Sequence, residues 1–219
     1  MMKTRNTIGG LIQGLLLFAM LALGPTIHAQ DVTLGEASFS ATSAVVADSW
    51  FEPMPFDQAK VFEGFGANAG STRTVTYSPG GTVAGVNAIK RHMVQAASAK
   101  SQLLQAVAPD TTEDVWIAID DQNNARVLKV QRAGTVVFEA SADTTPPIYI
   151  PATPVEGQSW DVAGATVTIE TVIASNSGCR LKVKTVAADG KMESNFLHAG
   201  DGLLMTETGG NSGYKLTAK

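Results

Sequence analysis

Cysteine and histidine are scarce in this sequence, and their scarcity excludes several kinds of site. Cys179 is the only cysteine among 219 residues, so no disulfide can form within the chain and no Cys-x-x-Cys pair exists. Only three histidines are present, and no His-x-x-x-His or Gly-x-Ser-x-Gly motif occurs. The pattern therefore predicts no catalytic residue, no metal site and no cofactor, and we expect a protein that is not an enzyme.

Basic residues and long apolar runs are also few. The chain has 16 Lys and Arg against 20 Asp and Glu, a formal net charge of −4, which disfavours nucleic acid as a partner. The one marked apolar run, residues 11–23, would span about 20 Å as a helix, against roughly 30 Å of hydrocarbon in a bilayer. We therefore expect no stable membrane insertion of the mature chain.

The first 29 residues have the layout of a cleaved export signal. Lys3 and Arg5 precede the apolar run, Gly24-Pro25 ends it, and the small residue Ala29 offers a cleavage point. The alternative is a retained membrane anchor, for which the run is short. No cysteine lies near the cleavage point, so no lipid can be attached there. We expect a periplasmic or secreted protein that begins near residue 30.

Beyond residue 50 the dominant pattern is an alternation of apolar and polar residues interrupted by turn residues, which is typical of antiparallel strands. It predicts one domain over residues 50–219, mainly β, with a strongly curved antiparallel sheet or partial barrel of eight to eleven strands and little helix. The expected turns are at residues 78–81, 120–124, 175–178 and 189–190.

Three segments are less clear. Residues 30–49 suggest an extended lead-in or a weak helix, and residues 96–107 fit a short helix or a continuing strand equally well. Cys179 shares one face of an alternating strand with Leu181 and Val183, which predicts a buried thiol. A reactive or intermolecular thiol is the alternative.

The two halves of the domain, residues 50–145 and 148–219, resemble each other around Pro146-Pro147. Ile89-Lys90 matches Leu181-Lys182, and Trp116-Ile117 matches Phe196-Leu197. The identities are few, so chance similarity is the alternative. A true repeat would mean two meanders of three or four strands each, joined into one curved sheet.

Three stretches of the second half carry a resemblance to a known group. They are Gly157 to Trp160 after a proline-bearing strand start, Cys179-Arg180-Leu181-Lys182, and Gly200-Asp201-Gly202-Leu203 after an aromatic strand. This pattern resembles uncharacterised exported β-rich bacterial proteins, which are similar to LolA-like half-barrel periplasmic carriers. The resemblance covers residues 148–210 well and 50–130 poorly. It implies a curved sheet facing an apolar cavity, with an apolar small molecule, a lipid or a lipoprotein as ligand.

Two features with possible chemistry have simpler explanations. Asp120 to Asn124 resembles a calcium loop only faintly, because the glycine and the bidentate glutamate of an EF-hand are missing, so a plain turn is expected. His92 and His198 lie in alternating strands, and we expect neither to sit in a pocket beside an acid and a nucleophile.

The aromatic residues lead to the functional expectation. Most of them should belong to the core, but a curved sheet with few covering helices can leave some lining a cavity. Trp116, Trp160 and Phe196 are the first candidates for that lining. We expect an exported, non-enzymatic module that binds an apolar ligand or a partner chain on its concave face. The alternative is a structural or adhesive cell-envelope protein that acts through its surface.

Overall fold

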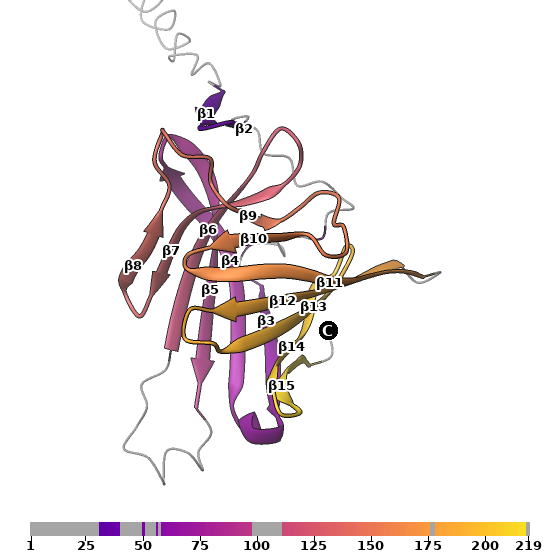
Figure 1. Cartoon of the computed structure of the whole chain (residues 1–219). Helices are drawn as coiled ribbons and strands as arrows, with labels where there is room; N and C mark the ends of the chain where they lie inside the picture. Colours follow the sequence, from indigo (N-terminus) through magenta and orange to yellow (C-terminus); the bar gives the residue numbers. More distant parts are fainter. Residues whose placement is uncertain are drawn as a thin grey trace, which may run out of the picture.

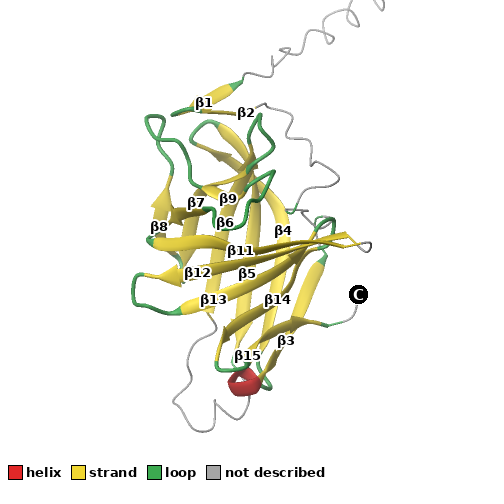
Figure 2. Ribbon diagram, turned by 45° about the vertical axis from the view of Figure 1, so that its right-hand side comes forward, coloured by secondary structure: helices red, strands yellow, loops and turns green. Residues whose placement is uncertain are grey.

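The computed structural model describes residues 31–39, 50, 56, 58–97, 111–175 and 178–217, apart from the side chains of residues 175, 178 and 179. In this part of the chain the only helical piece is a 3₁₀ turn at Gly66–Asn68, red in Figure 2. The prediction of a mainly β protein with little helix is confirmed.

The strands are β1 Val32–Leu34, β2 Ala37–Phe39, β3 Ala59–Phe65, β4 Thr72–Val83, β5 Val86–Ala96, β6 Thr111–Ile119, β7 Ala125–Arg132, β8 Thr135–Glu139, β9 Ile148–Ile150, β10 Ser159–Val162, β11 Ala165–Ser175, β12 Gly178–Ala187, β13 Met192–His198, β14 Gly202–Gly209 and β15 Ser212–Leu216.

Thirteen strands form one antiparallel sheet made of two meanders. Strands β3 to β8 form the first, β10 to β15 form the second, and β15 pairs with β3 to join them. Strand β9 pairs with β7 and lies beside β10. Within the described residues β8 pairs only with β7 and β10 only with β11, so the sheet stays open. The count exceeds the predicted eight to eleven because strands as short as β9 and β10 show little alternation.

The sheet curves so strongly that its two meanders face each other. Strands β11 to β13 pass in front of β4 to β6 in two views (Figures 1 and 2). One hydrophobic cluster contains Ile117 and Val127 from the first meander together with Ile169, Leu181 and Leu197 from the second. The predicted curved antiparallel sheet is confirmed, and its main core lies on the concave side.

A second cluster covers part of the convex face. Leu34 and Phe39 of the β1–β2 hairpin are fully buried there against Leu128 and its neighbours. The backbone N–H of Asp121 donates to the carbonyl oxygen of Ser38 at 2.9 Å, which ties the hairpin to the sheet. The lead-in predicted over residues 30–49 is thus a hairpin where it is described, and residues 40–49 lie outside the described part.

The turn predicted at residues 78–81 was wrong. Strand β4 continues through these residues with a bulge between Pro79 and Thr82, and the turn follows at Ala84-Gly85. Strand β3 pairs with β4 only as far as Thr76. Beyond that point β4 has one neighbour, so a proline without a backbone N–H is tolerated inside the strand.

The bulge also provides space for an aromatic ring. The indole Nε1–H of Trp116 donates to the carbonyl oxygen of Gly80 at 3.0 Å. A Cβ atom at Gly80 would lie 2.9 Å from the Trp116 ring and 2.9 Å from the carbonyl oxygen of Ala88. Glycine is required here because the indole packs directly on the backbone.

The residues matched between the two halves of the sequence occupy equivalent places in the two meanders. Lys90 lies opposite Trp116 in the third and fourth strands of the first meander, and Lys182 lies opposite Phe196 in those of the second. In each meander the next ladder has a bulge directly after the aromatic residue. Each meander has six strands rather than three or four, and the two share register and bulge position at this point.

The remaining local predictions have mixed outcomes. The turns at residues 120–124 and 189–190 are confirmed. The turn at 175–178 is only partly described, and the segment 98–107 lies outside the described residues, although β5 extends to Ala96. The predicted export signal and the side chain of Cys179, predicted to be buried, also lie outside them. Among the described residues there is no helix with the length and hydropathy needed to cross a membrane.

Candidate functional site

The concave side of the sheet encloses a cavity of about 500 Å³, called the central cavity below. Ligand pockets in proteins are typically about 300–1,000 Å³, so the volume suits one small molecule. Both meanders contribute to the wall, and Trp50 joins them from the segment before β3. Much of the lining is apolar, including Phe62, Val75, Met93, Val115, Val127, Val130, Ile150, Val162, Val167, Val183, Leu197 and Leu203.

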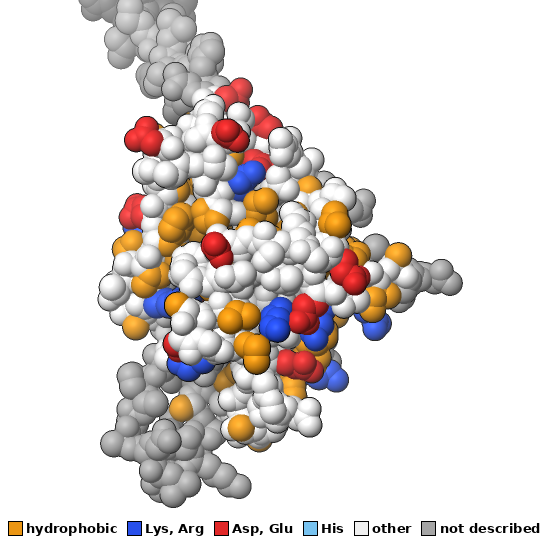
Figure 3. Space-filling model, in the orientation of Figure 1, with side chains coloured by type: hydrophobic (Ala, Val, Ile, Leu, Met, Phe, Trp, Pro, Cys, Tyr) orange, Lys and Arg blue, Asp and Glu red, His pale blue; other side chains and the backbone are white. Residues whose placement is uncertain are grey.

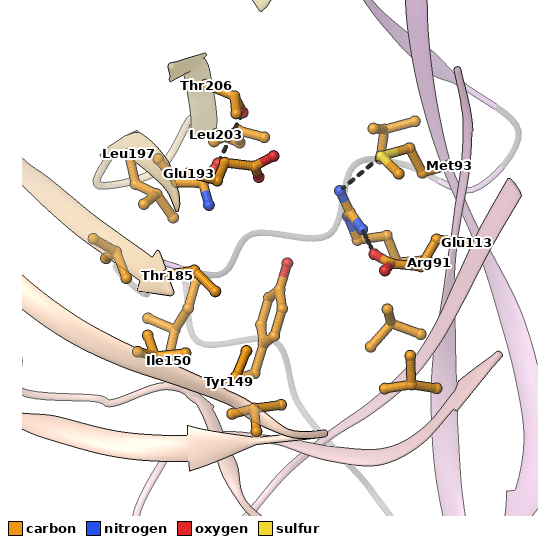
Figure 4. A pocket seen from close by; sticks show the side chains of 18 of the residues that line it. Arg91, Met93, Glu113, Tyr149, Ile150, Thr185, Glu193, Leu197, Leu203 and Thr206 are labelled. Carbon is orange, nitrogen blue, oxygen red and sulfur yellow. Dashed lines mark hydrogen bonds and ion pairs between the residues drawn. The ribbon is translucent and has the colours of Figure 1, made fainter. Parts of the chain in front are cut away.

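Charged and polar side chains reach into the central cavity from opposite walls. Figure 4 shows Arg91 beside Glu113 on one side and Glu193 on the other. Tyr149, from β9, lies between them with its hydroxyl group directed toward the centre. Arg73, from β4, also lines the cavity. The site is therefore an apolar chamber with a cluster of charged groups inside it.

The two arginines are buried, and their ion pairs are loose. The side chains of Arg73 and Arg91 are 8% and 9% exposed. Arg73 lies 3.5 Å from Glu193 and 4.2 Å from the centre of the Tyr214 ring, and Arg91 lies 3.5 Å from Glu113. Charge-assisted N–H···O bonds usually measure about 2.7–2.9 Å, so neither pair has the geometry of a strong one.

The surroundings keep Arg91 charged and Tyr77 neutral. Burial alone would lower the pKa of Arg91, but the nearby phenols of Tyr149 and Tyr77 and the carboxylate of Glu113 raise it above its ordinary value. Burial raises the pKa of Tyr77 to about 12, although the Arg91 cation acts in the opposite direction. The cavity thus contains a fixed positive charge next to a phenol that resists ionisation.

The raised pKa of Tyr77 predicts a loss of stability in alkali. The folded protein keeps the phenol protonated up to about pH 12, whereas an unfolded tyrosine ionises near pH 10. The stabilisation that comes from the raised pKa of Tyr77 is therefore complete below pH 10 and is lost as the pH rises from 10 to 12. Between pH 9 and pH 11 we expect wild type to lose about 1 kcal/mol more unfolding free energy than Tyr77→Phe, measured by urea denaturation. Equal losses of unfolding free energy in the two proteins would contradict a raised pKa of Tyr77 in the folded state.

The three aromatic candidates do not come together. Trp116 and Phe196 lie on the convex face, where Lys90 and Lys182 stand over their rings at 5.0 and 5.6 Å from the ring centres. Trp160 packs against the main core on the concave side. None of the three is among the residues that line the central cavity. The alternation of apolar and polar residues assigns side chains to the two faces of the sheet, but it does not say which face is concave.

His92 and His198 each have a carboxylate partner. His92 Nδ1 lies 2.5 Å from Asp114 Oδ1, and Lys90 lies 2.9 Å from the other oxygen of the same carboxylate. His198 Nδ1 lies 3.1 Å from Asp201 Oδ2. Neither histidine lines the central cavity. The expectation of a non-enzymatic protein therefore stays a prediction.

The sequence reasoning missed the charged residues of the cavity, and a signal for them was present. Arg91 alternates with Ile89 and Met93, and Arg73 alternates with Val75. In a strand, residues two apart point to the same face, so a cation between apolar residues of that spacing lies on the apolar face.

Comparisons with known proteins do not extend these observations. No protein-family model, no curated protein sequence and no solved structure matches the chain.

Proposed function

We propose that this protein is an exported, non-enzymatic binding module that holds an apolar ligand inside its curved sheet. The observation that carries the proposal is the central cavity of about 500 Å³ on the concave side of an otherwise packed domain. Its volume and its mainly apolar lining with a few polar and charged side chains are typical of a site for a small ligand. The export signal in the sequence and the resemblance to LolA-like proteins support the same function. On the face seen in Figure 3 acidic and basic side chains are interspersed, as expected of a water-exposed surface.

A variant that fills the cavity tests the proposal. Ala165 of β11 lines the cavity and is partly buried, so Ala165→Phe places a ring inside it. Ala174 is exposed on the same strand, which makes Ala174→Phe the matched control. With N-phenyl-1-naphthylamine, an uncharged fluorescent probe, we expect Ala165→Phe to weaken binding about tenfold or more, equivalent to about 1.4 kcal/mol. The control should bind like wild type.

Native mass spectrometry of protein purified from cells gives an independent measurement. A bound apolar molecule in wild type that is absent from Ala165→Phe would support the proposal. An apo mass for wild type, together with no response to the probe, would overturn it. That result would favour the structural or adhesive envelope protein instead.

A further inference from the structure

The charge of the central cavity is opposite in sign to that of the whole chain. Five basic side chains line it and two acidic ones, whereas the chain carries a net charge of −4. The basic residues are Lys60, Arg73, Arg91, Arg132 and Lys191, and the acidic ones are Glu113 and Glu193. Arg132 and Lys191, with side chains 55% and 85% exposed, mark the end that opens to solvent. At that end Arg132 contacts Glu113 at 3.0 Å and Lys191 contacts Asp189 at 2.6 Å. An anion therefore meets its positive partners further inside, at Arg73 and Arg91, whose ion pairs are longer.

Burying the charges of Arg73 and Arg91 lowers the stability of the fold, so their presence is best explained by a further role. Moving an ion out of water costs several kcal/mol, and replacing a buried ion pair with apolar side chains is often neutral or stabilising. Arg73 and Arg91 are among the few charged residues that the structure buries in the described part of the chain. Packing alone would be served equally well by leucine or methionine at both positions.

Both guanidinium groups retain capacity to bind an anion. The Nε–H of Arg73 is buried and has no hydrogen-bond partner among the described residues, whereas its Nη2 donates to Gln95 Oε1 at 3.1 Å. Arg91 contacts the sulfur of Met93 at 3.9 Å, which is a weak acceptor, and it also forms a hydrogen bond with the Tyr77 side chain. Guanidinium groups match carboxylate and phosphate oxygens in a bidentate geometry, which these partners do not provide.

The apolar part of the remaining lining suits a hydrocarbon chain, and Thr185, Asn195 and Thr206 lie beside it on the second meander. Val167, Val183, Leu197 and Leu203 line the wall formed by the second meander, and Figure 4 shows Leu197 and Leu203 across the chamber from Arg91. A ligand that fills the cavity therefore meets positive charge at one part and apolar side chains at another.

We propose that the ligand is a single-chain amphiphile with an anionic head group, either a carboxylate or a phosphate, which Arg73 and Arg91 bind. The tail packs against the apolar wall of the second meander. This inference rests on the proposed function and specifies its ligand class. The negative net charge of the chain does not contradict this ligand class, because the head group is bound inside the cavity.

A series of ligands with the same twelve-carbon tail isolates the head group. Dodecanoate, dodecyl phosphate, dodecanol and dodecylamine are each titrated against bound N-phenyl-1-naphthylamine. We expect one or both anions to bind about tenfold or more tighter than the alcohol, because a charged hydrogen bond contributes about that much. The amine should bind most weakly. The two anions distinguish a fatty-acid type of ligand from a phosphate ester.

Variants then assign the preference to the arginines. Arg91→Met and Arg73→Met should each reduce the preference for an anion over dodecanol to about threefold or less, with dodecanol binding retained. Lys182→Met removes the same charge from the convex face, where Lys182 contacts Glu170 at 2.8 Å, and should leave the preference unchanged. Glu193→Gln removes the acid beside Arg73 and should strengthen anion binding.

The outcomes separate this inference from the proposed function. If wild type binds dodecanol and both anions equally well, the head-group inference is overturned and the apolar site stands. If none of the four ligands binds, both are overturned. If the arginine variants fail to fold, as judged by circular dichroism, the wild-type series and Glu193→Gln still decide the question.

Discussion

Replacing Asp120 with alanine is expected to destabilise the protein by about 3–5 kcal/mol, the usual cost of leaving a buried cation without its partner. The Asp120 carboxylate is 3% exposed and lies 2.5 Å from Nε of Arg126. It also accepts the backbone N–H groups of Gln122 and Asn124 at 3.0 and 2.8 Å. The change therefore removes an ion pair and two turn hydrogen bonds together. Urea denaturation followed by circular dichroism measures the loss.

The effect should extend to the connection between the meanders. Arg126 donates through Nη1 to the carbonyl oxygen of Pro146 at 2.8 Å, so its position depends on Asp120. Asp121→Ala is the matched control, since this neighbouring carboxylate is exposed and carries the same charge. We expect the control to change stability by less than about 0.5 kcal/mol. Similar losses for the two variants would show that the buried pair contributes nothing specific.

Replacing Ile169 with alanine should cost about 2–5 kcal/mol, as for other large-to-small changes in a packed core. Ile169 is fully buried in the cluster that contains residues of both meanders. Because the cluster is shared, we expect the loss to appear as one cooperative transition at lower urea concentration. Differential scanning calorimetry should likewise show a single peak.

The same strand supplies the control. Ile173, four residues further along β11, is 51% exposed, and Ile173→Ala should cost less than about 1 kcal/mol. Two separate transitions in Ile169→Ala would contradict the shared core and indicate meanders that unfold independently. Equal costs at the two positions would contradict the assignment of the concave face.

The sequence was sufficient for the fold class because alternation and turn residues are local signals. Asp120 to Asn124 was identified as a turn from its residue types alone, and the structure places four of the Asp120 hydrogen bonds within that turn and at Arg126. Residues 78–81 have equally strong turn chemistry, yet they form a bulge. Whether they form a turn or a bulge depends on where β3 stops pairing with β4 and on the packing of the Trp116 ring. Neither can be predicted from the residues next to them in the sequence.

The cavity was harder to predict because alternation gives two faces without saying which is concave. Val115 to Ile119 is apolar on both faces, since the β1–β2 hairpin covers the convex side there. Large aromatic residues were therefore poor guides to the lining. Arg91 was the better guide, because a cation that shares its face with Ile89 and Met93 needs an explanation that a solvated strand does not provide.

The seam between β15 and β3 has a consequence for the order in which the protein can form. Among the described strands, every other ladder except β7–β9 joins strands that follow each other in the chain, whereas this one pairs residues 213–216 with residues 62–65. One edge of β3 therefore has no partner until β15, the last strand in chain order, pairs with it. Unpaired edges invite association between chains. The incompletely folded chain is consequently exposed to association with other copies of itself until β15 pairs with β3.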